Sequence, residues 1–166
     1  SEALKSALSA EGFSIEGGVA DIPTAFVASY GSGEPVIAVI GEFDALPGIS
    51  QAAVPFEQKI EGKSAAQACG HHLFGAGSAG AAIAVKEWLE RTGTPGTIQF
   101  FGTPAEEGGS GKVYMVRAGL FDDVDTVIHW HPSSVNAADS ASTLANRSAK
   151  FTFSGVSSHA ASAPDR

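Results

Sequence analysis

Along the chain, apolar residues occur either in short continuous runs or at helical spacing. This pattern predicts alternating strands and helices. Leu4, Ala7 and Leu8 recur at helical spacing, which predicts a helix over 2–10. Short apolar runs bounded by turn residues predict strands over 13–17, 25–30, 36–40, 97–101 and 126–130. Longer segments predict helices over 72–90 and 112–118, closed by Gly93 and Gly119.

The order of these elements predicts an α/β fold, with an open sheet that contains parallel strands and is flanked by helices. The run at 36–40 is apolar throughout, which is typical of a strand covered on both faces, and the segment 126–130 is predicted to be a further buried strand. After Pro132 the composition shifts to Ser, Ala and Asn, and 148–154 alternates like a half-exposed strand. We therefore predict one domain over 1–146 and the first strand of a smaller α+β domain over 147–166, in a chain that is a piece of a longer protein.

Composition narrows the range of functions. The chain has 166 residues, 43% of them hydrophobic, and a formal charge of −8 without a basic cluster. These values predict no nucleic-acid or membrane surface and favour a small-molecule substrate. A single cysteine, the lack of a signal-like N-terminal segment and the lack of a long apolar run predict a cytoplasmic protein.

Three short clusters carry the candidate chemistry, and each follows or adjoins a predicted strand or helix end. They are Cys69-Gly70-His71-His72, Ala105-Glu106-Glu107-Gly108 and His129-Trp130-His131-Pro132. Thiolate, imidazole and carboxylate are the ligands that zinc, manganese or cobalt prefers. Because ligands bind at the carboxyl ends of strands in open α/β sheets, these clusters predict a metallohydrolase site at one edge.

Alternative interpretations exist for Cys69, for the adjacent glutamates and for one glycine-rich segment. A lone cysteine is most often a buried small residue, but Cys69 precedes a predicted helix whose N-terminus favours thiolate. Glu106 and Glu107 would form a solvated pair elsewhere, yet here they lie between an apolar run and a glycine-rich turn. The segment 75–80 matches the dinucleotide pattern G-x-G-x-x-G, but it lies inside the helix and is better explained by close helix packing.

Four motifs together resemble the peptidase M20 family of metallopeptidases, in its amidohydrolase branch. They are Gly41-Glu42-Phe43-Asp44-Ala45-Leu46-Pro47-Gly48, Ala68-Cys69-Gly70-His71, Thr103-Pro104-Ala105-Glu106-Glu107-Gly108 and Gly155-Val156-Ser157-Ser158-His159-Ala160. Within that branch the chain is similar to aminobenzoyl-glutamate hydrolase-like proteins. The resemblance spans about residue 12 to the last residue, with the motifs in the same order.

The resemblance implies a site with two divalent metal ions, zinc or manganese, with cobalt as an alternative. It implies that Cys69 bridges the ions and that His71 and Glu107 ligate them. It leaves His131 and His129 as alternatives for the next ligand, of which we favour His131.

The resemblance assigns the remaining residues to proton transfer and positioning. Glu106 would be the general base, and Asp44 an outer-shell or near-metal carboxylate. His72 is either an added ligand or a residue of the helix N-terminus, and His159 resembles a lid histidine that stabilises the oxyanion.

The predicted function is hydrolysis of an amide bond between an acyl or aroyl group and an amino acid by metal-activated water. The alternative is a non-catalytic metal-binding fragment or an inactive homologue. The resemblance also implies a homodimer formed through the smaller domain and a further metal-ligating histidine downstream. The 166-residue chain is therefore expected to be inactive by itself.

Overall fold

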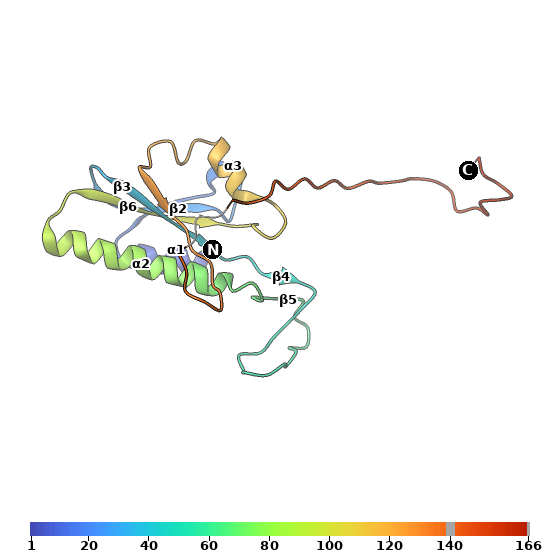
Figure 1. Ribbon diagram of the computed structural model, residues 1–166, viewed down its shortest axis with the longest axis horizontal. Helices are drawn as coiled ribbons and strands as arrows, with labels where there is room; N and C mark the ends of the chain where they lie inside the picture. Colours follow the sequence, from blue (N-terminus) through green and yellow to red (C-terminus); the bar gives the residue numbers. More distant parts are fainter. Residues whose placement is uncertain (139–141, 166) are drawn as a thin grey trace. The chain divides into compact units, whose positions relative to one another are not determined.

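The computed structural model describes residues 1–138 and 142–165, and the chain divides into two compact units, Ser1–Ser134 and Val135–Arg166. The first unit contains a five-stranded sheet in the order β1-β2-β6-β3-β7 (Figure 1). These strands are β1 (Ser14–Gly17), β2 (Phe26–Ser32), β3 (Val36–Glu42), β6 (Gly96–Thr103) and β7 (Thr126–Ile128). A separate antiparallel pair joins β4 (Leu46–Pro47) to β5 (Ala65–Ala66).

The sheet is mixed, and its parallel part positions the site. β3 pairs in parallel with β6 on one side and with β7 on the other, whereas β2 runs antiparallel to both β1 and β6. The carboxyl ends of β3, β6 and β7 therefore lie at the same edge of the sheet. The predicted α/β fold with parallel strands and flanking helices is confirmed.

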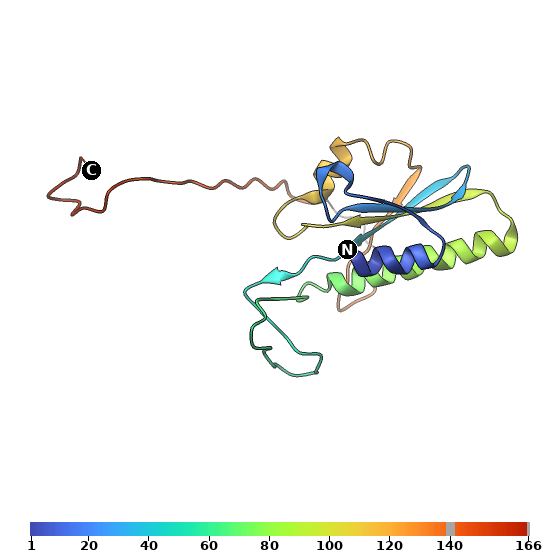
Figure 2. The same ribbon diagram turned by 180° about the vertical axis from the view of Figure 1, so that it is seen from behind.

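Helices cover the two faces of the sheet. α1 (Glu2–Ala10) and α2 (His71–Thr92) lie together along one face, and the shorter η1 (Val19–Asp21) and α3 (Gly111–Arg117) lie on the other (Figures 1 and 2). Successive strand side chains point to opposite faces, so β2 sends Phe26 and Ala28 into one core cluster and Val27 into the other. This alternation explains why one sheet supports two apolar clusters.

Glycines in α2 allow the helix to approach the sheet closely. Gly75 is buried, and a Cβ atom built there would lie 2.7 Å from the backbone oxygen of Glu42. A Cβ atom at Gly77 would lie 2.8 Å from the ring of Trp130. The structure thus supports the packing interpretation of the G-x-G-x-x-G pattern.

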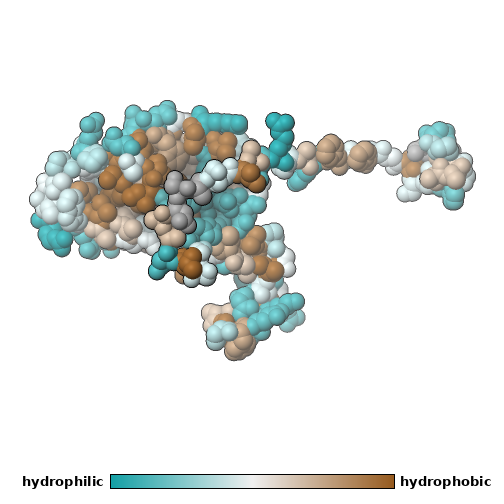
Figure 3. Space-filling view, in the orientation of Figure 1, coloured by the Kyte–Doolittle hydropathy of each residue, from teal (hydrophilic) through white to brown (hydrophobic). Residues whose placement is uncertain are grey.

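The end of β7 differs from the prediction. β7 stops at Ile128 rather than at residue 130, because Trp130 turns away and its Nε1 donates to Ser78 Oγ on α2 at 3.0 Å. The expected burial is also wrong: Val127 is 42% exposed, because β7 is the last strand of the described sheet. Figure 3 shows apolar surface over this strand, which is orange in Figure 1.

The second unit does not form the strand that the alternation predicted. Residues 148–154 contain no strand, and Phe151 and Phe153 are 81% and 92% exposed. A strand needs the backbone hydrogen bonds of a partner strand, and none pairs with this segment in the described residues. The first strand of a smaller domain and the domain boundary near Asn146 both stay predictions.

One negative finding concerns membranes. None of the helices that the structure describes combines the length and the apolar character needed to span a membrane.

Candidate metal centre

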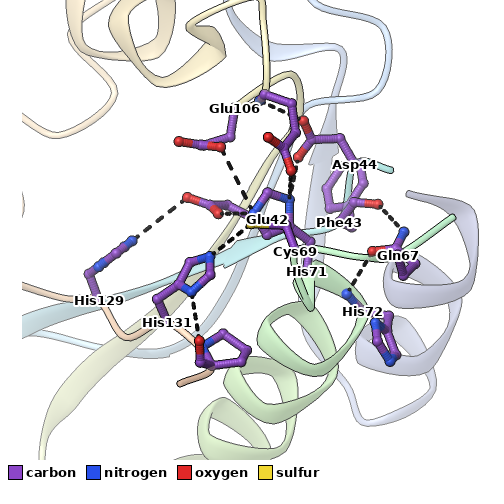
Figure 4. Close-up of polar contacts among 12 residues, drawn as sticks. Glu42, Phe43, Asp44, Gln67, Cys69, His71, His72, Glu106, His129 and His131 are labelled. Carbon is purple, nitrogen blue, oxygen red and sulfur yellow. Dashed lines mark hydrogen bonds and ion pairs between the residues drawn. The ribbon is translucent and has the colours of Figure 1, made fainter. Parts of the chain in front are cut away.

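The carboxyl edge of the parallel strands brings together the predicted clusters. Asp44 follows β3, Glu106 follows β6 and His131 follows β7, while His71 begins α2 beside them. Figure 4 shows these side chains pointing toward a common centre. The arrangement follows from the topology, because loops after adjacent parallel strands meet at one edge.

His71 lies at the centre of the cluster and is fully buried. Its Nδ1 lies 3.0 Å from Asp44 Oδ1, and the other oxygen of Asp44 accepts the backbone N–H of Glu107 at 3.0 Å. A carboxylate partner places the proton on Nδ1 and leaves the lone pair of Nε2 free for a metal ion. These contacts support the outer-shell role predicted for Asp44.

Two sets of ligand atoms converge on His71. Cys69, His71 and His131 form one set and Glu42, His71 and Glu106 form the other, with the ligand atoms of each set within 4.8 Å of one another. Cys69 Sγ lies 3.5 Å from His131 Nε2, and His71 Nε2 lies 3.9 Å from Glu106 Oε2. The structure therefore brings thiol, imidazole and carboxylate donors together.

Several buried polar atoms in this cluster are unsatisfied, which tests whether a metal ion fits. Glu42 Oε2, His71 Nε2 and Glu107 Oε1 are buried, and none has a hydrogen-bond partner within the described chain. Leaving such atoms unpaired is costly, and a divalent cation satisfies lone pairs that no hydrogen reaches. Mixed sulfur, nitrogen and oxygen donors suit zinc and its neighbours, so the residues fit a metal centre.

The thiol of Cys69 is held in its neutral form by its surroundings. Burial raises its pKa above the ordinary value, and the negative charges of Glu107, Glu106 and Glu42 raise it further. Desolvation and the three carboxylates therefore oppose the thiolate that the N-terminus of α2 is expected to favour, and the ligand role of Cys69 stays a prediction. A bound cation reverses this balance, since metal binding displaces the thiol proton.

The geometry separates the two candidate histidines. His131 Nδ1 lies 3.0 Å from the Pro132 carbonyl oxygen, and a proton shared there leaves Nε2 free toward Cys69. His129 Nε2 instead lies 3.7 Å from Glu42 Oε1 (Figure 4). A Cβ atom at Gly70 would lie 3.2 Å from Pro132, so the glycine admits the His131-Pro132 segment close to Cys69. This placement favours His131, although both assignments stay predictions.

Two predicted residues lie apart from the cluster. His72 is exposed and lies in the first turn of α2, where its backbone N–H donates to Gln67 Oε1 at 3.0 Å. His159 belongs to the second unit, where its Nδ1 lies 2.9 Å from Ser162 Oγ. The roles given to both by the resemblance stay predictions.

The sequence interpretation placed Glu42 at this edge of the sheet but gave it no role, and it missed Lys112 as a site residue. Glu42 is only 2% exposed, and its Oε1 forms an ion pair with Lys112 Nζ at 2.5 Å. The position of Glu42 directly after a buried apolar run was a signal that it lies at the site edge. No sequence signal indicated that Lys112 reaches it.

Comparisons with known proteins agree with this geometry. The model of Peptidase family M20/M25/M40 matches residues 38–160. A p-aminobenzoyl-glutamate hydrolase subunit of Escherichia coli is 48% identical over 98% of this chain and 34% of that protein. The human Xaa-Arg dipeptidase is 37% identical over 74% of this chain and 25% of that protein.

A solved structure extends the agreement to the fold. The YXEP protein of Bacillus subtilis, a dinuclear metal-binding peptidase from the M20 family, matches with a TM-score of 0.66 and 28% identity, over 80% of this chain and 36% of that chain. The chain thus spans about a third or less of the length of these relatives. The family match covers most of the chain, from within β3 through the three clusters described above, and the chain belongs to Peptidase family M20/M25/M40.

Proposed function

We propose that the protein containing this chain is a metal-dependent amidohydrolase that cleaves the amide bond between an acyl or aroyl group and an amino acid. The observation that carries the proposal is the convergence of Cys69, His71 and His131 with buried, unsatisfied carboxylate oxygens. The likeness to the p-aminobenzoyl-glutamate hydrolase of Escherichia coli supports an aroyl or acyl amino acid as the substrate class.

The residues that would hold two divalent ions are Cys69, His71, Glu107 and His131, with zinc or manganese preferred and cobalt as the alternative. When bound, such ions polarise the amide carbonyl and lower the pKa of water. Asp44 keeps the ring of His71 oriented and fixes the backbone at Glu107, so a single carboxylate organises two of the ligands.

The two adjacent glutamates have different surroundings, which supports different roles. The Glu106 side chain is 44% exposed and therefore reachable by water and substrate, whereas Glu107 is 22% exposed and has a buried Oε1. Glu106 takes the proton from the attacking water and delivers it to the departing nitrogen. The amide C–N bond breaks, a C–O bond forms, and the products are a carboxylic acid and an amine.

A cavity beside the first turn of α2 is a candidate subsite for part of the substrate. It has a volume of about 1230 Å³ and is lined by the loop after β4, by β5 and by His72, one residue from His71. Lys59 and Lys63 contribute positive charge to its wall. Glu57 lies on the same wall, so the lysines leave one net positive charge there, which suits the carboxylate of an amino acid.

We also propose a cytoplasmic location and a homodimer formed through the smaller domain, in which His159 stabilises the oxyanion. The location is supported by the single cysteine of the chain, which cannot form an internal disulfide. The dimer and the role of His159 are supported by the resemblance of the motif at 155–160.

The test is the Glu106→Gln variant of the full-length protein, compared with Glu16→Gln on β1 as a matched control. Glu106→Gln is expected to retain its metal, measured by mass spectrometry, while hydrolysis of p-aminobenzoyl-glutamate and N-acyl amino acids falls about 10²–10⁴-fold. A near-normal rate would refute the role of Glu106 as general base. Loss of metal would instead indicate that Glu106 is the metal ligand and Glu107 the general base. A metal-loaded wild type that hydrolyses no amide would favour a non-catalytic metal-binding protein.

A further inference from the structure

Glu42 is a buried carboxylate whose two oxygens face different partners. Oε1 lies 2.5 Å from Lys112 Nζ and 3.7 Å from His129 Nε2. Oε2 lies 2.9 Å from His71 Nε2, yet neither of these two atoms has a hydrogen-bond partner among the described residues. One oxygen is thus held by an ammonium group, while the other lies against the Nε2 atom of His71.

The unsatisfied oxygen lies where a cation would bind. Glu42 Oε2 and His71 Nε2 belong to a set, completed by Glu106, whose ligand atoms lie within 4.8 Å of one another. Because Asp44 engages Nδ1 of His71, the Nε2 atom offers a lone pair toward Glu42. With the proton of His71 on Nδ1, this lone pair and the anionic oxygen repel each other at 2.9 Å unless a cation lies beside them.

Lys112 is fixed in the position from which it holds Glu42. It is in the first turn of α3, and the preceding Gly111 packs so closely that a Cβ atom there would overlap the Pro104 backbone oxygen. Pro104 is itself two residues before Glu106. The start of α3 is therefore anchored to the same segment that carries the adjacent glutamates.

We infer that Glu42 is a further metal ligand of this site, through Oε2, and that Lys112 is the positioning residue that orients it. The inference rests on the proposed function, because it requires a metal centre. Lys112 binds Oε1 and so restricts rotation of the carboxylate, leaving Oε2 directed at His71 and Glu106. Partners of this kind typically change metal affinity 10–100-fold when they are removed.

The test is Co²⁺ affinity and the visible absorption spectrum of bound Co²⁺ in the full-length protein. Lys112→Met is expected to weaken Co²⁺ binding about 10–100-fold, with Lys112→Arg restoring most of it. Glu42→Gln is expected to weaken binding by at least as much and to change the spectrum, because an oxygen ligand is lost. Lys86→Met is the matched control. Lys86 lies in the half of α2 that is far from His71, where it contacts Glu90 of the same helix and Glu11 at the end of α1.

The double variant Glu42→Gln with Lys112→Met separates positioning from a general charge effect. It leaves no unpaired charge at this pair, so it is expected to fold and to bind Co²⁺ like Glu42→Gln alone. A further loss of affinity in the double variant would overturn the positioning role. Unchanged affinity and spectrum in Glu42→Gln would overturn the ligand role while leaving the proposed function intact, whereas a wild type that binds no Co²⁺ would refute both.

Discussion

Replacement of Gly75 by alanine tests how closely α2 must approach the site. The added Cβ atom would lie 2.7 Å from the backbone oxygen of Glu42 and 3.3 Å from Leu4 Cδ1. An ordinary carbon–oxygen contact is about 3.3 Å or longer, so the helix and strand must separate by roughly half an ångström. Leu4 Cδ1 is the end of a flexible side chain, but the Glu42 carbonyl belongs to β3, which is paired on both sides.

Gly80 provides the matched control on the same helix. No atom of the described chain beyond the helix's own backbone lies within 4 Å of a Cβ atom built at Gly80. Gly80→Ala should therefore raise the free energy of unfolding by up to about 1 kcal/mol, the helix-propensity gain of alanine over glycine. Gly75→Ala receives the same gain but loses about 1–3 kcal/mol to overpacking.

The two variants are therefore expected to differ by about 1–3 kcal/mol in the free energy of unfolding, with Gly75→Ala the less stable. Urea unfolding of the metal-free full-length protein measures this difference. Gly75→Ala should also bind Co²⁺ more weakly, because the displaced strand end carries Glu42 and leads to Asp44. Equal stability of the two alanine variants would refute the close contact between α2 and β3.

Four other predictions concern the metal centre and the part of the protein that activity requires. Cys69→Ser should lower metal content without unfolding the core, and His131→Ala should lower it more than His129→Ala; mass spectrometry of each purified variant decides both points. In the metal-free protein, Cys69 should react with iodoacetamide more slowly than free cysteine at pH 8 and should gain reactivity at higher pH, because its pKa is raised; an equal rate at pH 8 would contradict this. The 166-residue chain alone should hydrolyse p-aminobenzoyl-glutamate more than tenfold more slowly than the full-length protein, and activity closer than that would show that these residues suffice.

The order of elements and the location of the site were predictable from the sequence. Apolar periodicity reports on neighbours a few residues apart, so it identified β3, β6 and α2 to within a few residues. The clusters around Cys69 and Glu106 could be placed at one edge because the carboxyl ends of parallel strands coincide. The same local reasoning explains why the glycine pattern inside α2 was correctly interpreted as packing.

Only the tertiary structure decided which side chains meet. β7 is as apolar as a buried strand, and its exposure follows from its place at the end of the sheet, which no local pattern encodes. The alternation at 148–154 likewise predicts a strand, but a strand forms only when another strand supplies its hydrogen bonds. Periodicity determines which face a residue occupies and leaves open what covers that face.

The site residues show the same division at the level of single atoms. The sequence placed His129 and His131 equally near the edge, whereas the anchoring of Trp130 on Ser78 determines that His131 turns toward Cys69. The ion pair of Glu42 with Lys112 joins residues far apart in sequence, and its existence depends on how α3 packs beside β3. Local composition specifies which donors are available, but their directions follow from long-range packing, because a ligand site requires atoms from several elements to converge within a few ångströms.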